Sequence, residues 1–195
     1  MSDSGDLPSQ RAEAAIAAAA AAAVDQTDPS CEVAHGHAPA PAGASRTLVA
    51  VFDTPVARFL LSYARDTNYR AVLLEPDASK PAAAADGVEL VRDVDGEVDG
   101  GTDIVVTDHH RPELGIVLRD ALKSPARWVG VMGNPRHPGP HIAALTALGV
   151  PGEEIARVHR PIGLNIGSRT PAEIALSTMA GLIADRNQRA GGFTF

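Results

Sequence analysis

The sequence predicts an α/β protein with a doubly wound, mostly parallel sheet. Over residues 46–190, short apolar segments alternate with segments of helical periodicity, and the links between them are short. This alternation favours parallel strands that are joined by right-handed helical crossovers. Polar residues follow several of the apolar segments, and sheets of this kind bind ligands beyond the carboxyl ends of their strands. The pattern therefore predicts a Rossmann-like domain whose strand ends converge on one crevice.

Four apolar segments in the first half of this domain suit buried parallel strands. They are Thr47–Phe52, Arg70–Leu74, Val88–Val91 and Asp103–Thr107. A helix is expected after the first of them, because Asp53-Thr54-Pro55 combines a capping residue with a proline near the first helical position. One face of that helix is apolar, with Val56, Phe59, Leu60 and Tyr63.

Further elements complete the domain. We expect a helix that opens at Pro112, a strand over Trp128–Met132, and a helix around His141–Leu148. The last of these stops at Gly149, and glycine is typical of helix C-termini. The final helix begins at a capping box formed by Thr170 and Glu173, with a proline at the first helical position.

Residues 1–45 differ from the rest in composition. Ala12 to Val24 is almost entirely alanine, which favours a helix but offers almost no large side chain to bury. Asp25 to Ser45 is rich in Pro, Ala, Gly and Ser, as flexible linkers are. We therefore expect two parts: a frayed or docked alanine-rich helix with a flexible linker over 1–45, and the Rossmann-like domain over 46–190.

Charge and cysteine content limit the function classes. The net charge of −7 argues against a broad nucleic-acid surface, which requires a basic footprint. The single cysteine, Cys31, excludes an internal disulfide and fits a reducing compartment. The alanine run lacks the basic start of a signal peptide, and no stretch approaches the roughly 20 strongly apolar residues of a membrane span. We expect a cytoplasmic protein that binds neither nucleic acid nor membrane.

The turn after the first strand departs from the pattern of dinucleotide-binding folds. It reads FDTPVA from Phe52 onward and contains no glycine, whereas glycines there permit a tight turn and close approach of a pyrophosphate. Phe52 and Thr54 are expected to crowd that approach, and Asp53 to repel the phosphate. Glu75 stands where an acidic residue accepts hydrogen bonds from a ribose, or it is a solvated strand-end carboxylate. The missing glycines argue against NAD(P) as the cofactor.

Two clusters with histidines each allow a functional and a structural interpretation. Asp108-His109-His110 follows a strand, where one imidazole offers acid–base or ligand chemistry, or where Asp108 only caps the next helix. Cys31, His35 and His37 resemble a loose metal set. Zinc sites normally need four ordered ligands, however, and these three residues lie in the predicted linker. We expect no metal site.

The segment Pro161–Pro171 combines glycines, an arginine and a helix start. Its glycine and polar positions are Gly163, Asn165, Gly167, Arg169 and Thr170. Free backbone N–H groups, the helix dipole and a guanidinium together make a good anion site. The alternative is a tight turn that only holds the last helix in place.

Three motifs resemble the XdhC/CoxI family of molybdenum-hydroxylase accessory proteins. Pro161–Ser177, which reads PIGLNIGSRTPAEIALS, is similar to the closing motif of that family. Trp128–Arg136, which reads WVGVMGNPR, resembles a family segment with an aromatic residue, V-G-x-x-G-S and basic residues. Thr107 and His110 match the family's T-H-D-H strand end at its first and last positions.

The resemblance implies a Rossmann domain with a chaperone-like role. Family members are associated with binding molybdenum cofactor and with helping to deliver its sulfurated form to xanthine dehydrogenase or carbon monoxide dehydrogenase-type enzymes. The chain also departs from the family. Its alanine-rich 45 residues stand where members carry an N-terminal domain, its first turn lacks glycine, and Asn165 and Asn134 replace an aspartate and a serine.

The sequence thus predicts an accessory or maturation protein rather than a catalyst, because no residue set makes a convincing catalytic machine. The implied ligand is molybdenum cofactor (molybdopterin) or a related anion, and the implied partner is a molybdenum hydroxylase. Whether the chain also forms a homodimer is left open by the sequence. An NAD(P)-dependent oxidoreductase and a ligand-free regulatory or scaffold protein are the alternatives. The expected binding residues are Asp53, Thr54, Glu75, Thr107, His110, Gly133, Asn134, Gly163, Asn165, Gly167, Arg169 and Thr170.

Overall fold

The computed structural model describes residues 29–36, 38, 46–80, 85–94, 98–134 and 136–192 of the 195-residue chain. The chain divides after Gly43 into two compact units. In the first unit, the described part contains the short helix α2 (Pro29–Ala34), which lies in the stretch interpreted from composition as a linker. The alanine-rich helix expected over residues 12–24 lies outside the described residues.

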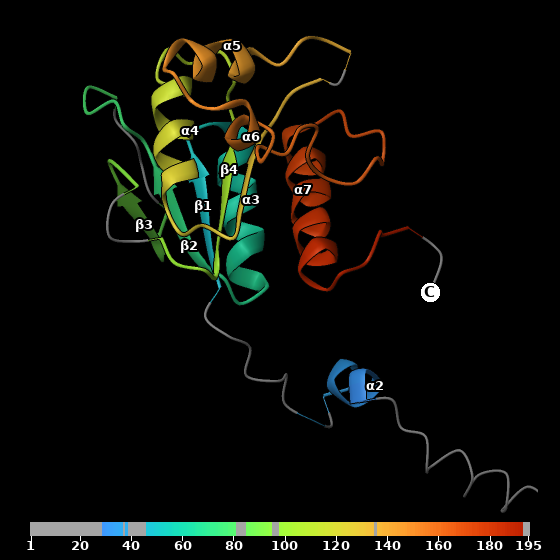
Figure 1. The fold of residues 1–195 in the computed structure, drawn as a ribbon. Coiled ribbons are helices and arrows are strands. Elements are labelled where there is room, and N and C mark those ends of the chain that lie inside the picture. Colours follow the sequence, from blue (N-terminus) through green and yellow to red (C-terminus); the bar gives the residue numbers. More distant parts are fainter. Residues whose placement is uncertain are drawn as a thin grey trace, which may run out of the picture. The chain divides into compact units, whose positions relative to one another are not determined.

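The second unit is built on a five-stranded parallel sheet. Its strands are β1 (Thr47–Val51), β2 (Arg70–Leu74), β3 (Val88–Val91), β4 (Thr102–Val106) and β5 (Trp128–Val131). They lie in the order β3-β2-β1-β4-β5 (Figure 1). From the central strand β1 the chain adds β2 and β3 on one side, and it then crosses over to add β4 and β5 on the other side. The predicted doubly wound fold is confirmed.

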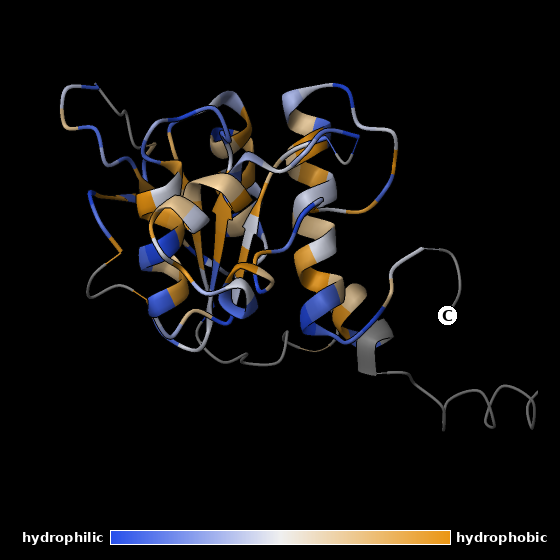
Figure 2. Cartoon of the chain, turned by 45° about the horizontal axis from the view of Figure 1, so that its top comes forward, coloured by the Kyte–Doolittle hydropathy of each residue, from blue (hydrophilic) through white to orange (hydrophobic). Residues whose placement is uncertain are grey.

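Helices cover both faces of this sheet. Helices α3 (Pro55–Asp66) and α7 (Pro171–Arg186) pack together on one face, and α4 (Leu114–Lys123) and α5 (Pro140–Ala147) pack together on the other. The short helix α6 (Gly152–Ile155), which the sequence did not predict, contacts α5. The strands are hydrophobic along their length, whereas each long helix carries both hydrophobic and hydrophilic residues (Figure 2).

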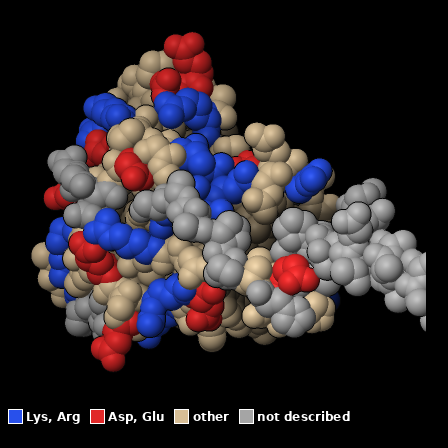
Figure 3. Space-filling model, turned by 90° about the horizontal axis from the view of Figure 1, so that it is seen from below, with Lys and Arg blue, Asp and Glu red and all other residues tan. Residues whose placement is uncertain are grey.

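Charged side chains on the face seen from below are of both signs and interspersed (Figure 3). Neither Lys and Arg nor Asp and Glu forms a continuous field on this face. Within the described ranges, no helix has both the length and the apolar character that crossing a bilayer requires.

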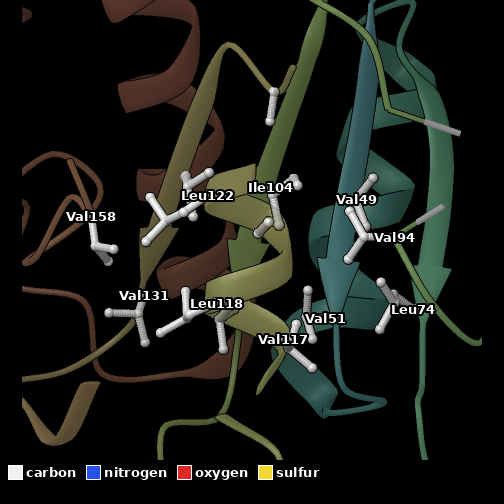
Figure 4. Packing of buried hydrophobic residues seen from close by; sticks show 14 of the residues in the cluster. Val49, Val51, Leu74, Val94, Ile104, Val117, Leu118, Leu122, Val131 and Val158 are labelled. Carbon is white, nitrogen blue, oxygen red and sulfur yellow. The ribbon is translucent and has the colours of Figure 1, made fainter. Parts of the chain in front are cut away.

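The core consists of two clusters, one on each face of the sheet, because side chains of a strand alternate between its faces. Val49 and Ile104 point toward α4 and contribute to the cluster that includes Leu118 (Figure 4). Leu48 and Ala50, on the opposite face, belong to the cluster that α3 and α7 cover. All five residues of β1 are buried, as expected for the central strand of a covered parallel sheet.

The start of α4 differs from its prediction. The helix begins at Leu114 rather than at Pro112, and its N-cap residue Glu113 makes no side-chain capping bond. Asp108 therefore does not cap it. The Oδ1 atom of Asp108 instead accepts a hydrogen bond from the backbone N–H of His110, at 2.9 Å. The predicted cap was wrong because the aspartate closes its own local turn first.

A buried carboxylate holds the amino ends of the strands to α7. Asp103, at the start of β4, is fully buried and accepts hydrogen bonds from Arg127 Nε at 2.8 Å and from Arg186 Nε at 2.9 Å. Arg186 also lies over the ring of Tyr69, with its Cζ atom 5.2 Å from the centroid. The cluster ties β4, the residue before β5 and the last turn of α7 to one another.

Replacing Asp103 with asparagine should lower the free energy of unfolding by about 3 kcal/mol, because two arginines would lose their buried partner. Asp120→Asn, at an exposed pair with Arg119, is the matched control and should change it by less than about 0.5 kcal/mol. Urea denaturation of both variants measures the difference. Equal effects would contradict a structural role for the Asp103 cluster.

Candidate functional site

Two threonine hydroxyls join the carboxyl ends of β1 and β4. Thr54 is the N-cap of α3, where its Oγ1 accepts from the N–H of Ala57 at 3.0 Å and donates to Oγ1 of Thr107 at 2.9 Å. Thr107 in turn donates to the carbonyl oxygen of Val51, at 2.8 Å. Both hydroxyls therefore form hydrogen bonds within the protein. These bonds hold the ends of β1 and β4 together at the place where the strand order reverses.

Phe52 takes the place and the conformation of a glycine in the first turn. Its φ of 72° lies in the left-handed region, so β1 ends one residue before the predicted boundary. The expectation that its side chain would crowd a phosphate was wrong, because Phe52 is fully buried in the core. The guanidinium carbon of Arg111 lies over its ring, 4.5 Å from the centroid.

Glu75, at the end of β2, is neither free for a ribose nor solvated. Only 1% of the residue is exposed, and its carboxylate accepts from Arg111 Nη2 at 2.9 Å and from Arg111 Nη1 at 3.2 Å. The backbone N–H groups of Asp53 and Asp77 donate to the same carboxylate, at 3.1 and 3.2 Å. The solvated alternative was wrong, because the arginine partner lies 36 residues away along the chain and could not be seen from the local sequence. The four donors from the protein argue against the ribose interpretation.

These contacts set the charge state of the pair. Burial alone would raise the pKa of Glu75, but the hydrogen bonds from Arg111 and from the N–H groups of Asp53 and Asp77 outweigh it and hold that pKa below its usual value. The hydrogen bond with Glu75 raises the pKa of Arg111, and a second pair with Glu113, at 3.1 Å, adds to it. The two groups form an ion pair at neutral pH.

The Glu75–Arg111 pair occupies the anchor points of a dinucleotide. The N–H of Asp53, in the turn where a pyrophosphate would approach, already donates to Glu75. The side chain of Asp53 is paired with Arg58 at 2.9 Å, so its charge is compensated. In this domain the usual ribose acceptor and a turn donor are therefore bonded to the protein itself.

Two histidines and an arginine lie at the ends of β4 and β5. His109 and His110 lie against each other, with ring centroids 4.1 Å apart. Arg160 donates to the carbonyl oxygens of Asn134 at 2.8 Å and His137 at 3.1 Å, and it has no carboxylate partner among the described residues. Arg160 is not among the binding residues expected from the sequence, although it directly precedes the closing motif.

The absence of a side chain at position 133 makes room for this arginine. A β-carbon there would lie 2.5 Å from Nε of Arg160 and 2.8 Å from its Nη2, so the guanidinium would have to move from its present place. The side chain of Asn134 is exposed, and its Oδ1 accepts from the N–H of Arg136 at 2.9 Å. The predicted residues Gly133 and Asn134 thus shape the loop into which Arg160 fits.

Two histidines beside Arg160 are held neutral. Burial is the main cause that lowers the pKa of His109, where the charge of Arg160 adds to the effect and the charge of Asp108 opposes it. His141, at the start of α5, is 5% exposed, and burial followed by the charge of Arg160 lowers its pKa. Both imidazoles thus lie close enough to Arg160 for its charge to act on them.

The loop before α7, residues 161–170, is called the closing loop here. It has fewer free hydrogen-bond donors than its sequence suggests. The predicted capping box is present, with the N–H of Glu173 donating to Thr170 Oγ1 at 3.3 Å. Glu173 Oε2 accepts from the N–H groups of Arg169 at 2.7 Å and Thr170 at 3.1 Å. A carboxylate of the protein thus already supplies negative charge at the start of α7.

Gly163 has a packing role in this loop. Its φ is 83°, and a β-carbon on it would lie 2.9 Å from Oγ of Ser177 and 3.0 Å from the backbone of Thr178. Gly181 faces it from α7, where a β-carbon would lie 3.0 Å from Cα of Gly163. Asn165, Gly167 and Arg169 are exposed, and no described residue bonds the side chain of Asn165 or Arg169.

Two cavities border the edge of the sheet. One of about 210 Å³ is lined by residues of the closing loop and α7, including Gly163 and Asp185, and one of about 170 Å³ is lined by Arg127 and Arg157 among others. Trp128 and His159 line both and stack with a centroid distance of 4.8 Å. Neither is lined by the polar strand ends, and each is smaller than pockets for drug-sized ligands.

Among the described residues, no group of acidic, histidine or cysteine side chains is placed to hold a metal.

The geometry agrees with a comparison against known families. Residues 48–182 match the model of the XdhC Rossmann domain, which covers the whole sheet and most of α7. The chain belongs to this family. The resemblance of its three motifs to XdhC proteins is therefore confirmed.

Individual relatives of this XdhC domain are longer than the chain. The uncharacterized protein YqeB of Escherichia coli (strain K12) is 38% identical over 75 residues, which are 38% of the chain and 14% of YqeB. A crystal structure described as a xanthine dehydrogenase from Bacillus halodurans superposes with a TM-score of 0.59 and 20% identity, over 78% of the chain and 46% of that protein. At that identity the superposition shows a shared fold.

The Glu75→Gln substitution should make the free energy of unfolding less sensitive to a fall in pH than it is in the wild type. A carboxylate with a lowered pKa in the folded state stabilises the fold above its unfolded pKa, about 4.3, and loses that contribution as pH falls through the folded pKa. The wild type should therefore exceed the variant by about 3 kcal/mol at neutral pH, and the gap should shrink in acid.

Urea denaturation between neutral pH and pH 3 measures this gap. Glu89→Gln is the matched control, because Glu89 forms an exposed pair with Arg70. A gap for Glu75→Gln that stays constant across that range would show that the ionised carboxylate does not stabilise the fold.

Proposed function

We propose that the chain is an accessory protein for the maturation of a molybdenum hydroxylase of the xanthine dehydrogenase or carbon monoxide dehydrogenase type. It binds molybdenum cofactor or a related anionic ligand at the carboxyl ends of its strands, in a cytoplasmic setting. The observation that carries the proposal is the match to the XdhC Rossmann domain over residues 48–182. Arg160, a guanidinium without a carboxylate partner among the described residues, supports an anionic ligand in a chain whose net charge is −7.

The residues at the strand ends fit the anionic part of molybdopterin, which carries a phosphate. Arg160 offers a guanidinium without a carboxylate partner, and the buried Nδ1 of His141 has no hydrogen-bond partner among the described residues. These two residues, with the loop at Gly133 and Asn134, would hold that part of the cofactor. When bound, the cofactor supplies the redox-active metal that the hydroxylase uses.

The chain's own part in this function is binding and orientation. Its single cysteine, Cys31, lies outside the Rossmann unit, so that unit offers no thiol to carry sulfur. Arg111, whose guanidinium lies at the carboxyl end of β2, is already bonded to Glu75 and Glu113. The residues left to meet a ligand are therefore those at the ends of β4 and β5, and they bind rather than react.

Co-purification is the direct test. The tagged full chain, expressed together with a xanthine dehydrogenase-type hydroxylase from its own organism, should retain that enzyme or release a fluorescent oxidised pterin on denaturation. Glu89 lies on the edge strand β3. The Glu89→Gln variant should therefore retain the enzyme or release the pterin as the wild type does. Absence of both the enzyme and the pterin would favour a ligand-free scaffold instead.

Nicotinamide cofactors should not bind. The Glu75–Arg111 pair occupies the anchor points of a dinucleotide, so we expect no heat of binding when NADH or NADPH is titrated into the protein by calorimetry. Micromolar affinity for either one would overturn the accessory role in favour of an oxidoreductase. Adenosine monophosphate in a parallel titration separates recognition of the adenosine half from that of the whole cofactor.

A further inference from the structure

Arg160 has more donors than the protein uses. A guanidinium carries five N–H donors, and the protein accepts from two of its nitrogens, through the carbonyl oxygens of Asn134 and His137. Its Nε is buried and has no partner within the described ranges. Because Nε is buried against Gly133, an acceptor from outside the chain would bind the second hydrogens of Nη1 and Nη2, which the two carbonyl oxygens leave free.

His141 adds a second unsatisfied donor or acceptor at the same place. Its side chain folds back over Gly139, the N-cap residue of α5, since a β-carbon on Gly139 would lie 2.3 Å from Cε1 and 2.6 Å from Nδ1 of His141. The same β-carbon would lie 3.4 Å from Nη1 of Arg160. His141 is 5% exposed, and its Nδ1 has no partner in the described part of the chain.

The start of α5 supplies a backbone donor beside these two side chains. No side chain caps this helix. Pro140 has no N–H, and the N–H of Ile142 donates to the carbonyl oxygen of Gly139 at 3.1 Å, so the N–H of His141 is the donor left at this end among the described residues. The helix dipole places partial positive charge at the same end. Helix α5 lies at the end of the domain toward which the strands run, which is where parallel sheets of this type bind ligands (Figure 1).

We propose that the start of α5, together with Arg160 and His141, is a binding site for a phosphoryl group. This rests on the proposed function, in which the chain holds an anionic ligand, and it assigns the part of that ligand that α5 recognises. A phosphoryl group presents three terminal oxygens and two negative charges. It can therefore accept from the guanidinium, from an imidazole and from a helix N–H at once, whereas a carboxylate has two oxygens for three sets of donors.

The nearby charges favour the same ligand. His109, His110 and Arg136 lie on the two loops that flank Arg160, and the acidic side chain among them, Asp108, is engaged by the N–H of His110. The site predicted at the closing loop differs in this respect, because Glu173 already meets the donors at the start of α7. The two sites thus make opposite predictions for Arg160 and Arg169.

The test is a titration of the 15N-labelled full chain with inorganic phosphate at neutral pH, followed by NMR. Amide shifts should concentrate at Gly139, His141 and Ile142. Arg160→Gln should weaken phosphate binding by roughly tenfold to a hundredfold, as expected for loss of hydrogen bonds to a charged group. His141→Phe, which keeps a packed ring without nitrogen, should weaken it by at least about threefold.

Arg169→Gln is the matched control and should leave the phosphate affinity unchanged, since Arg169 is exposed at the start of α7. Arg160→Lys keeps the charge but loses the planar fork, so an intermediate affinity is expected. Thermal melting of each variant separates loss of binding from loss of the fold.

Shifts spread over the whole surface, or unchanged affinity in a folded Arg160→Gln variant, would overturn the proposal. A loss with Arg169→Gln instead would transfer the site to the closing loop. If phosphate fails to bind while the hydroxylase or the pterin still co-purifies, the phosphoryl site is wrong and the accessory role stands. If phosphate binds at α5 but neither co-purifies, the accessory role is wrong and the site stands.

Discussion

The Glu75–Arg111 ion pair decides how this Rossmann domain can be used. It lies at the carboxyl end of β2, links the turn after β1 to the loop before α4, and is covered from below by the ring of Phe52. A buried pair of this kind persists because its lone pairs and protons are nearly all met by hydrogen bonds, which offsets the cost of removing two charges from water. The same completeness leaves no donor or acceptor there for a ribose or a pyrophosphate. The groups at the centre of the sheet that bind a ligand in dinucleotide-binding folds are thus used here to stabilise the fold.

Binding capacity is therefore displaced toward β5. The close approach that glycine normally allows in the first turn is absent there, where Phe52 adopts the left-handed conformation at a cost in strain. Close approach instead occurs at Gly133, where the missing side chain admits the guanidinium of Arg160. Since Arg160 is fixed by two backbone carbonyls rather than by a carboxylate, its charge is positioned without being neutralised. A positioned and uncompensated cation is what an anion site requires.

The sequence predicted the fold more completely than the site, and the difference has a physical cause. The strands and the capping box at Thr170 depend on residues close together along the chain, and both were predicted correctly. Glu75 was misjudged because its partner is 36 residues away, and Asp108 because a local turn competed with the helix cap. Arg160 and His141 carry no local pattern at all. Their importance depends on contacts with the loop around Gly133 and Gly139, which only the folded chain brings together.

The closing motif illustrates how a resemblance can identify a fold without identifying a site. Its glycine at position 163 approaches Gly181 of α7 so closely that a side chain on either would disturb the packing, and its Thr170 and Glu173 satisfy each other at the helix start. These residues hold α7 against the loop, and α7 in turn packs on α3 and reaches Asp103 through Arg186. A motif with those duties is needed wherever this arrangement of helix and loop occurs, whatever the domain binds. The identity of the ligand must then depend on residues outside the motif, and Arg160, which immediately precedes it, is the first place to look.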